Sequence, residues 1–91
     1  MCRNIRVLYN FEPPTTREEM SAAALQYVRK VSGLQKPGAA DQETFTKAVD
    51  EVTAATERLL ATLQARSPVR TRDGEKEKAR KRWMMREARL R

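Results

Sequence analysis

The stretch from residue 41 to residue 66, DQETFTKAVDEVTAATERLLATLQAR, constrains the fold most, because the rest of the chain has to be arranged around it. Its mostly apolar residues recur at alternating spacings of four and three, which places them on one face of an α-helix. A helix with one such face cannot bury it alone, so another element must pack against it. The face consists of Phe45, Val49, Val52, Thr56, Leu59 and Leu63, widened by Ala48, Ala55 and Leu60.

A shorter helix is predicted before this one. The residues from Thr16 to Glu19 read T-R-E-E, the capping-box pattern, so the helix should begin here. Gly33 is well placed to end it in a left-handed conformation. The connection over residues 32–40 contains Pro37 and Gly38 and should return the chain antiparallel. The apolar face of the shorter helix consists of Met20, Ala23, Ala24, Tyr27, Val28 and Val31.

The ends of the longer helix follow from local signals. Asp41 suits the N-cap position, where its charge also complements the positive end of the helix dipole. The helix should end near Arg66, because Ser67 precedes Pro68 and is pushed out of the helical region.

The N-terminal segment has the alternation of a strand. Ile5, Val7, Tyr9 and Phe11 occupy every second position, and Pro13-Pro14 ends the run. A lone strand must lie over the helices as an extended arm, pair with its copy in a dimer, or add to a partner's sheet. We take the arm as the default, since it needs no second molecule.

Charge divides the chain into two parts. The net charge is +7, yet residues 1–65 carry eight basic and eight acidic side chains, whereas residues 66–91 carry eleven basic and four acidic ones. We therefore expect a neutral helical-hairpin domain with its arm over residues 1–66, a linker over 67–74, and a basic C-terminal helical tail over 75–91. The predicted fold is mainly α, an antiparallel helical hairpin with an extended N-terminal arm and a basic C-terminal helix.

Composition limits the classes of function. No apolar run has the length of a membrane span or the form of a signal peptide, and a single cysteine fits a reducing compartment, so we expect a cytoplasmic protein. Without histidine, a Cys/His metal site is impossible, and no metal or cofactor is expected. The core of such a short chain is modest, which keeps a homodimer or a protein partner open as a source of stability.

Three motifs mark a resemblance: MCRNI at the start, NFEPPTT before the first helix, and LQYVRKVSG followed by KP. With these, the chain resembles a small bacterial family of unknown function whose members begin Met-Cys-Arg-Asn-Ile, the Domain of Unknown Function 2277 family. The resemblance covers roughly the first two thirds of the chain and implies one complete small protein, but no catalytic residues. It is carried by residues 1–5, Asn10, Phe11, Pro13, Pro14, Ala23, Ala24, Leu25, Tyr27, Val28, Arg29, Lys30, Ser32, Gly33, Lys36, Pro37, Phe45, Ala48 and Val49, whereas Trp83-Met84-Met85 departs from it.

The basic tail is the leading candidate site. Its cations supply point charges for phosphate, and its tryptophan can stack on an unpaired base, which together favour contact with RNA, such as that of the ribosome, or with DNA. The alternatives are a solvated charged helix, with Trp83 folded onto the hairpin, or a contact with a membrane surface or an acidic protein. The candidate residues are Lys76, Lys78, Arg80, Lys81, Arg82, Trp83, Arg86, Arg89 and Arg91.

A second candidate is an anion site. Arg3 and Arg6 near the amino terminus can hold a phosphate or carboxylate, or can instead pair with acidic residues of the hairpin. Arg29, Lys30 and Lys36 surround a glycine-containing bend whose N–H groups suit phosphate, although the basic pair also suits the negative end of the helix dipole.

Cys2 is the third candidate. If Met1 is removed, Cys2 exposes an amine and a thiol on adjacent carbons, able to chelate a metal or act as a nucleophile. An enzyme also needs a base and an orienting group, and no histidine is present to serve. We therefore expect no enzymatic activity and regard Cys2 as a small residue that anchors the arm.

Overall fold

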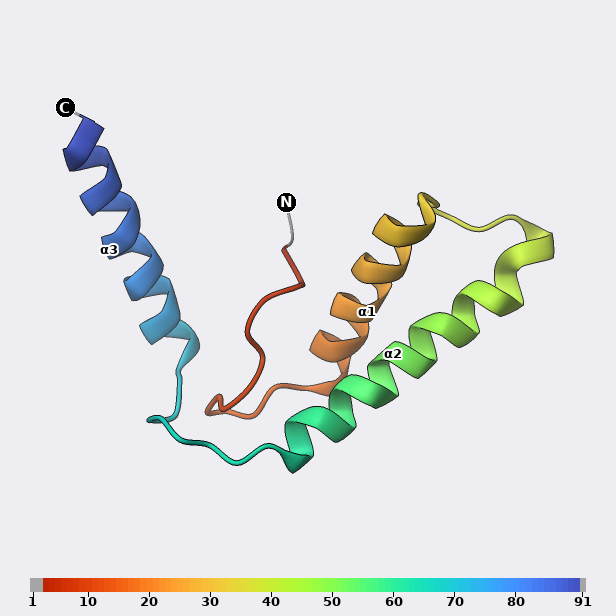
Figure 1. The fold of residues 1–91 in the computed structure, drawn as a ribbon, viewed down its shortest axis with the longest axis horizontal. Coiled ribbons are helices and arrows are strands. Elements are labelled where there is room, and N and C mark those ends of the chain that lie inside the picture. Colours follow the sequence, from red (N-terminus) through yellow and green to blue (C-terminus); the bar gives the residue numbers. More distant parts are fainter. Residues whose placement is uncertain (1–2, 91) are drawn as a thin grey trace.

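The computed structural model describes residues 3–90, which form helices and no strand. Helix α1 spans Arg17–Ser32, a single 3₁₀ turn η1 spans Ala39–Asp41, α2 spans Gln42–Thr62 and α3 spans Arg72–Leu90. Helices α1 and α2 pack side by side as a hairpin, and α3 rises separately at the other side of the molecule (Figure 1). The mainly α fold with a helical hairpin is thereby confirmed.

Local signals set both ends of α1. The Thr16 hydroxyl accepts a hydrogen bond from the Glu19 N–H at 3.3 Å, and the Glu19 carboxylate accepts one from the Thr16 N–H at 3.0 Å, which completes the predicted capping box. Gly33 follows the helix with φ of 74°, and its N–H donates to the Arg29 carbonyl at 3.0 Å. The predicted start and end of this helix are confirmed.

Helix α2 begins at the predicted position but is shorter than predicted. Asp41 occupies the N-cap position, but its side chain makes no capping hydrogen bond. The helix ends at Thr62 rather than near Arg66. Arg17, in the first turn of α1, pairs with Glu57 at 3.1 Å, so residues beyond Thr62 extend past the start of α1 and have no helix to pack on. Packing therefore ends α2 before the Ser-Pro signal does.

The core between α1 and α2 is small. Among the described residues, the buried apolar side chains are Met20, Ala24 and Val28, and Thr53 is buried opposite them. The Thr53 hydroxyl donates to the Val49 carbonyl at 2.7 Å, which satisfies its polar group inside the interface. The predicted apolar faces are thus only partly covered: Tyr27, Val31, Leu59 and Leu63 remain about half exposed or more.

The molecule is thin and extended. Its Cα atoms span 51 × 36 × 16 Å with a radius of gyration of 16.6 Å, whereas a compact domain of this length has about 12 Å. Its accessible surface is 7631 Å², against about 5400 Å² for a compact protein of the same mass. Within residues 3–90, α3 packs against neither α1 nor α2. The helices form a single layer instead of two packed ones (Figure 1).

The arm is irregular, despite its strand-like alternation. It lies along α1, where the N–H groups of Asn4 and Ile5 donate to the Gln26 side-chain oxygen at 2.9 and 3.1 Å. Near its end it forms an isolated parallel bridge between Phe11 and Arg70, a residue of the expected linker. The arm is therefore fixed to the hairpin on one side and to the base of α3 on the other.

Candidate nucleic-acid interface

Helix α3 begins at Arg72, before the expected position of Glu75. The Thr71 hydroxyl accepts a hydrogen bond from the Gly74 N–H at 2.9 Å, which makes Thr71 the N-cap. Gly74 fits this turn because an added Cβ would lie 2.7 Å from that hydroxyl oxygen. The last residues of the expected linker, from Arg72 to Gly74, thus form the first turn of the basic helix.

Arg70 joins the base of α3 to the arm. Its N–H donates to the Asn10 carbonyl at 2.7 Å, and its carbonyl accepts from the Glu12 N–H at 2.9 Å. Its guanidinium donates to the Tyr9 carbonyl at 2.8 Å and pairs with Glu75 at 3.1 Å. Both the backbone and the side chain of Arg70 therefore hold the first turn of α3 against the arm.

Asn10 shapes the arm at this junction. Its backbone has φ of 63°, a left-handed conformation that asparagine tolerates better than most residues. Its side-chain amide donates to the carbonyls of Ser67 and Pro68 at 3.2 and 3.1 Å. The turn at Asn10 thus also holds the segment that follows α2.

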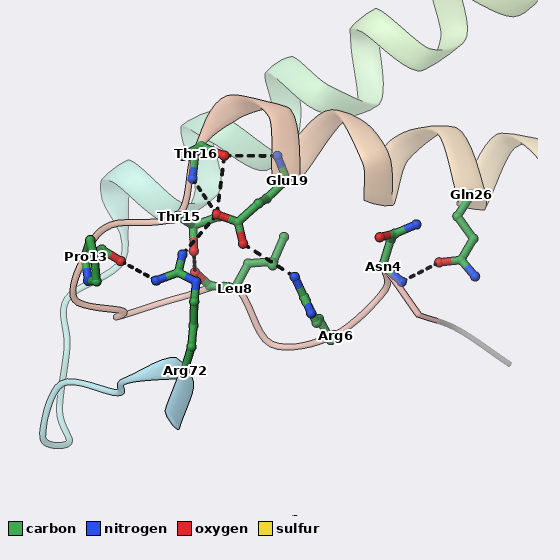
Figure 2. A network of polar contacts seen from close by, with 9 residues as sticks. All are labelled: Asn4, Arg6, Leu8, Pro13, Thr15, Thr16, Glu19, Gln26 and Arg72. Atoms are coloured by element: carbon green, nitrogen blue, oxygen red, sulfur yellow. Dashed lines mark hydrogen bonds and ion pairs between the residues drawn. The ribbon is translucent and has the colours of Figure 1, made fainter. Parts of the chain in front are cut away.

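Arg72 makes the second connection. Its guanidinium donates to the Pro13 carbonyl at 2.8 Å and pairs with Glu19 of α1 at 2.9 Å (Figure 2). It also lies over the Phe11 ring, 5.3 Å from the ring centroid, a distance at which a cation is attracted to the ring face. Arg72 thereby links α3 to both the arm and the hairpin.

Glu19 is the shared acceptor of this network. Its carboxylate caps α1 through Thr16, pairs with Arg72, and faces Arg6 at 3.5 Å (Figure 2). The hydrogen bond from the Thr16 backbone lowers the pKa of Glu19, and Arg72 lowers it further, although desolvation by burial opposes both. For Arg6, the sequence left two alternatives open, an anion site or an ion pair with the hairpin. The structure shows the ion pair, with Glu19.

A groove of about 580 Å³ lies between the arm and α3. Its apolar part comes from Val7, Leu8 and Phe11 of the arm and Ala79 of α3. Charged side chains share the same lining, and cations outnumber carboxylates among them. These are Arg6, Glu19, Arg72, Glu75, Lys76 and Arg82.

The predicted tail residues that the structure describes lie on α3 and are all exposed: Lys76, Lys78, Arg80, Lys81, Arg82, Trp83, Arg86 and Arg89. Arg80 pairs with Glu77 at 2.7 Å, while the other cations of this set make no ion pair within residues 3–90. The Trp83 side chain is 60% exposed, so in the structure it is not folded onto the hairpin. Arg91 lies outside the described residues.

Two neighbouring rows lie along α3, and Arg82 belongs to both of them. Lys78, Arg82, Arg86 and Arg89 recur every three or four residues and form a basic row along one side of the helix. Trp83 follows Ala79 by one turn, so it continues the side that lines the groove. A phosphate chain following the basic row would thus pass beside a ring able to stack on a base.

A family model described as "Uncharacterized conserved protein (DUF2277)" matches residues 1–78. The chain belongs to this family. No curated protein and no solved structure matches it significantly. The DUF2277 match includes Arg70, Arg72 and the first turns of α3, and it ends before Trp83 and most of the basic row.

The second group of predicted anion-binding residues in this DUF2277 protein lies at the end of α1 and in the connection that follows it. Arg29 and Lys30 lie in the last turn of α1, where the helix dipole favours cations, and Lys36 is exposed in the connection. Two N–H groups of the bend are already used: Gly33 donates to the Arg29 carbonyl, and Leu34 donates to the Ser32 hydroxyl at 3.1 Å. This bend therefore offers an anion fewer donors than its sequence indicates. Arg3 is exposed on the arm.

Sequence reasoning missed Arg70, Thr71 and Arg72. A local signal was present, since Thr71-Arg72-Asp73 repeats the Thr-Arg-acid pattern that starts α1 at Thr16. Gly74 obscured it, because glycine is unfavourable inside helices. No comparable signal marks the contacts of Arg70 and Arg72, whose partners lie far away in the sequence.

Two further observations concern residues 3–90. No helix in this range combines the length and apolar character that a membrane crossing requires. No group of three or more acidic or cysteine side chains in it is placed to hold a metal ion. Cys2 lies outside the described residues.

Proposed function

We propose that this protein binds the backbone of RNA, as in a ribosome-associated role, or of DNA, through α3 and without sequence specificity. On this proposal it is a cytoplasmic accessory protein and not an enzyme. The observation that carries the proposal is that α3 packs against neither helix of the hairpin, while within residues 3–90 its ion-paired cations are Arg72 and Arg80. Unpaired, solvated cations are available to replace the counterions of a phosphate chain.

The base of α3 supports the same function. Arg70 forms an ion pair with Glu75, and Arg72 forms one with Glu19. These two arginines therefore orient the helix instead of contacting a ligand. The cations from Lys76 onward then project from a fixed base. A helix held at one end and free along its length can lie against a phosphate backbone of irregular shape.

The test neutralises three of the four cations of the basic row. The variant Lys78→Gln/Arg82→Gln/Arg86→Gln should lower the affinity for a fluorescent single-stranded RNA and for duplex DNA. It should also reduce the slope of log affinity against log salt by about 2 to 3, because roughly 0.7 to 0.9 of a counterion is released per phosphate contact. A change of this size on both substrates indicates backbone contact.

The matched control removes the same charge elsewhere. Lys47→Gln/Arg58→Gln/Arg66→Gln changes three exposed cations outside α3 and should leave the salt slope near that of the unmodified protein. Equal losses in both triple variants would contradict a site on α3. Truncation after Arg66 is less suitable, because it also removes Arg70 and Arg72, which hold the arm.

A second candidate function is protein–protein interaction. Addition of the arm to a partner's sheet is not favoured, because the Asn10 carbonyl and the Glu12 N–H already pair with Arg70. The hairpin is the better surface, since its apolar faces are only partly covered.

A further inference from the structure

An uncharged apolar surface runs along one side of the hairpin. We call it the hairpin flank. Its members are half-buried or exposed, and none of them is charged. It consists of Ala23, Tyr27 and Val31 of α1, of Ala48, Val52, Ala55 and Leu59 of α2, and of Leu63, which follows α2.

The two halves of the hairpin flank lie on the same face. In α1, Tyr27 precedes the buried Val28, and in α2, Val52 precedes the buried Thr53. One residue is a rotation of about 100° about the helix axis. Because the two helices run antiparallel, the same rotation away from their contact leads to the same side of the pair. The flank is therefore a continuous surface beside the small core.

The accessible surface of the chain is larger than that of a compact protein of the same mass. The accessible surface of 7631 Å² is about 2200 Å² larger than expected for a compact protein of the same mass. A standard interface buries about 800 Å² on each partner. This excess belongs to the whole molecule, including the unpacked α3, and it is larger than the area that one standard interface buries on each partner.

Charge favours a second copy on this surface. Residues 1–65 carry eight basic and eight acidic side chains, so two hairpins approach without net repulsion. Residues 66–91 carry eleven basic and four acidic ones, so two tails repel each other and point apart. An acidic partner would be drawn to α3 and away from the uncharged flank.

We propose that a second copy of this chain covers the hairpin flank in a symmetric homodimer. The dimer adds the second packed layer that the single layer of helices lacks. It leaves both α3 helices exposed. This inference does not depend on nucleic-acid binding, and its test uses protein alone.

The test measures mass in solution. Light scattering of the full chain should give twice 10.5 kDa. Leu59→Glu and Val31→Glu place a charge in the flank at positions that are 54% and 66% exposed within one copy, so each should give a monomer. An unpaired charge at such an interface should weaken the dimer about a hundredfold or more. Met85→Glu, at a position that is 60% exposed on α3, is the matched control and should remain a dimer.

Thermal denaturation gives a second measurement. The melting temperature of the unmodified protein should rise with protein concentration, because association stabilises the folded chain by mass action. This holds even if a flank variant fails to fold. A monomeric unmodified protein, a dimeric Leu59→Glu variant, or a melting temperature independent of concentration would each overturn the proposal.

Discussion

At the scale of single residues, Glu19 connects three parts of the molecule. Its carboxylate caps α1, pairs with Arg72 of α3 and faces Arg6 of the arm. The side chain is 24% exposed, so solvent screens these pairs only in part. The position of α3 relative to the hairpin therefore depends on this carboxylate more than on apolar packing.

Replacing Glu19 by glutamine should show this dependence. Glu19→Gln keeps the size and a capping oxygen but removes the charge, so it should lower the free energy of unfolding by about 1 kcal/mol. Glu18→Gln, on the exposed neighbour in the same turn, is the control and should change it little. Urea denaturation of both variants measures the difference. Equal effects at the two positions would show that the network at Glu19 contributes no stability.

The pH dependence of that difference follows from the lowered pKa of Glu19. A carboxyl that ionises more readily in the folded state stabilises the fold above its unfolded pKa, near 4.5. This contribution is lost as the pH falls through the lowered folded value. The stability gap between the unmodified protein and Glu19→Gln should thus be full at neutral pH and shrink below about pH 4.5. Denaturation at a series of pH values measures it, and a gap that grows in acid would contradict the assignment.

At the scale of elements, the end of α1 depends on the conformation of one glycine. Gly33 has φ of 74°, whereas Gly38 has φ of −72° and nothing near a built Cβ. Gly33→Ala should cost about 1 kcal/mol, while Gly38→Ala should be neutral or slightly stabilising. Thermal denaturation of the two variants makes a matched comparison. Similar melting temperatures would contradict the role of Gly33.

Helix α3 should be unusually sensitive to its cap, because it lacks packing against α1 and α2. Thr71→Ala removes the hydroxyl that accepts from Gly74 and should destabilise the helix by about 1 kcal/mol. The helical circular dichroism signal should fall, since isolated helices of this length are marginal in water. Thr44→Ala, on the exposed side of α2, should leave it unchanged. A full helical signal in Thr71→Ala would show that other contacts hold α3.

These elements show which parts of the fold a sequence can predict. The capping box at Thr16 and the left-handed Gly33 depend on neighbouring residues, so both ends of α1 could be predicted. The end of α2 could not, because it depends on where α1 begins. The bridge of Phe11 to Arg70 and the pairing of Arg72 with Glu19 join segments far apart in the sequence, and no local pattern marks them.

At the scale of the whole molecule, the sequence could predict which residues form the candidate site but not where they lie in the fold. The charge division identified the cations of the tail. Their exposure, the groove beside them and the fixed base at Arg72 follow only from the three-dimensional arrangement. The thin, extended shape likewise follows from the arrangement, because α3 packs against neither α1 nor α2 within residues 3–90. Incomplete contact between the two predicted apolar faces leaves the hairpin flank open.

The most direct test of binding through α3 uses Trp83, the single tryptophan of the chain. Its side chain is 60% exposed and continues the groove side of the helix, so its emission reports on anything that binds there. Titration with single-stranded RNA at low salt should quench this emission as bases stack on the ring, and added salt should restore it. Emission that stays unchanged while RNA is shown to bind, or an absence of binding at low salt, would contradict the account.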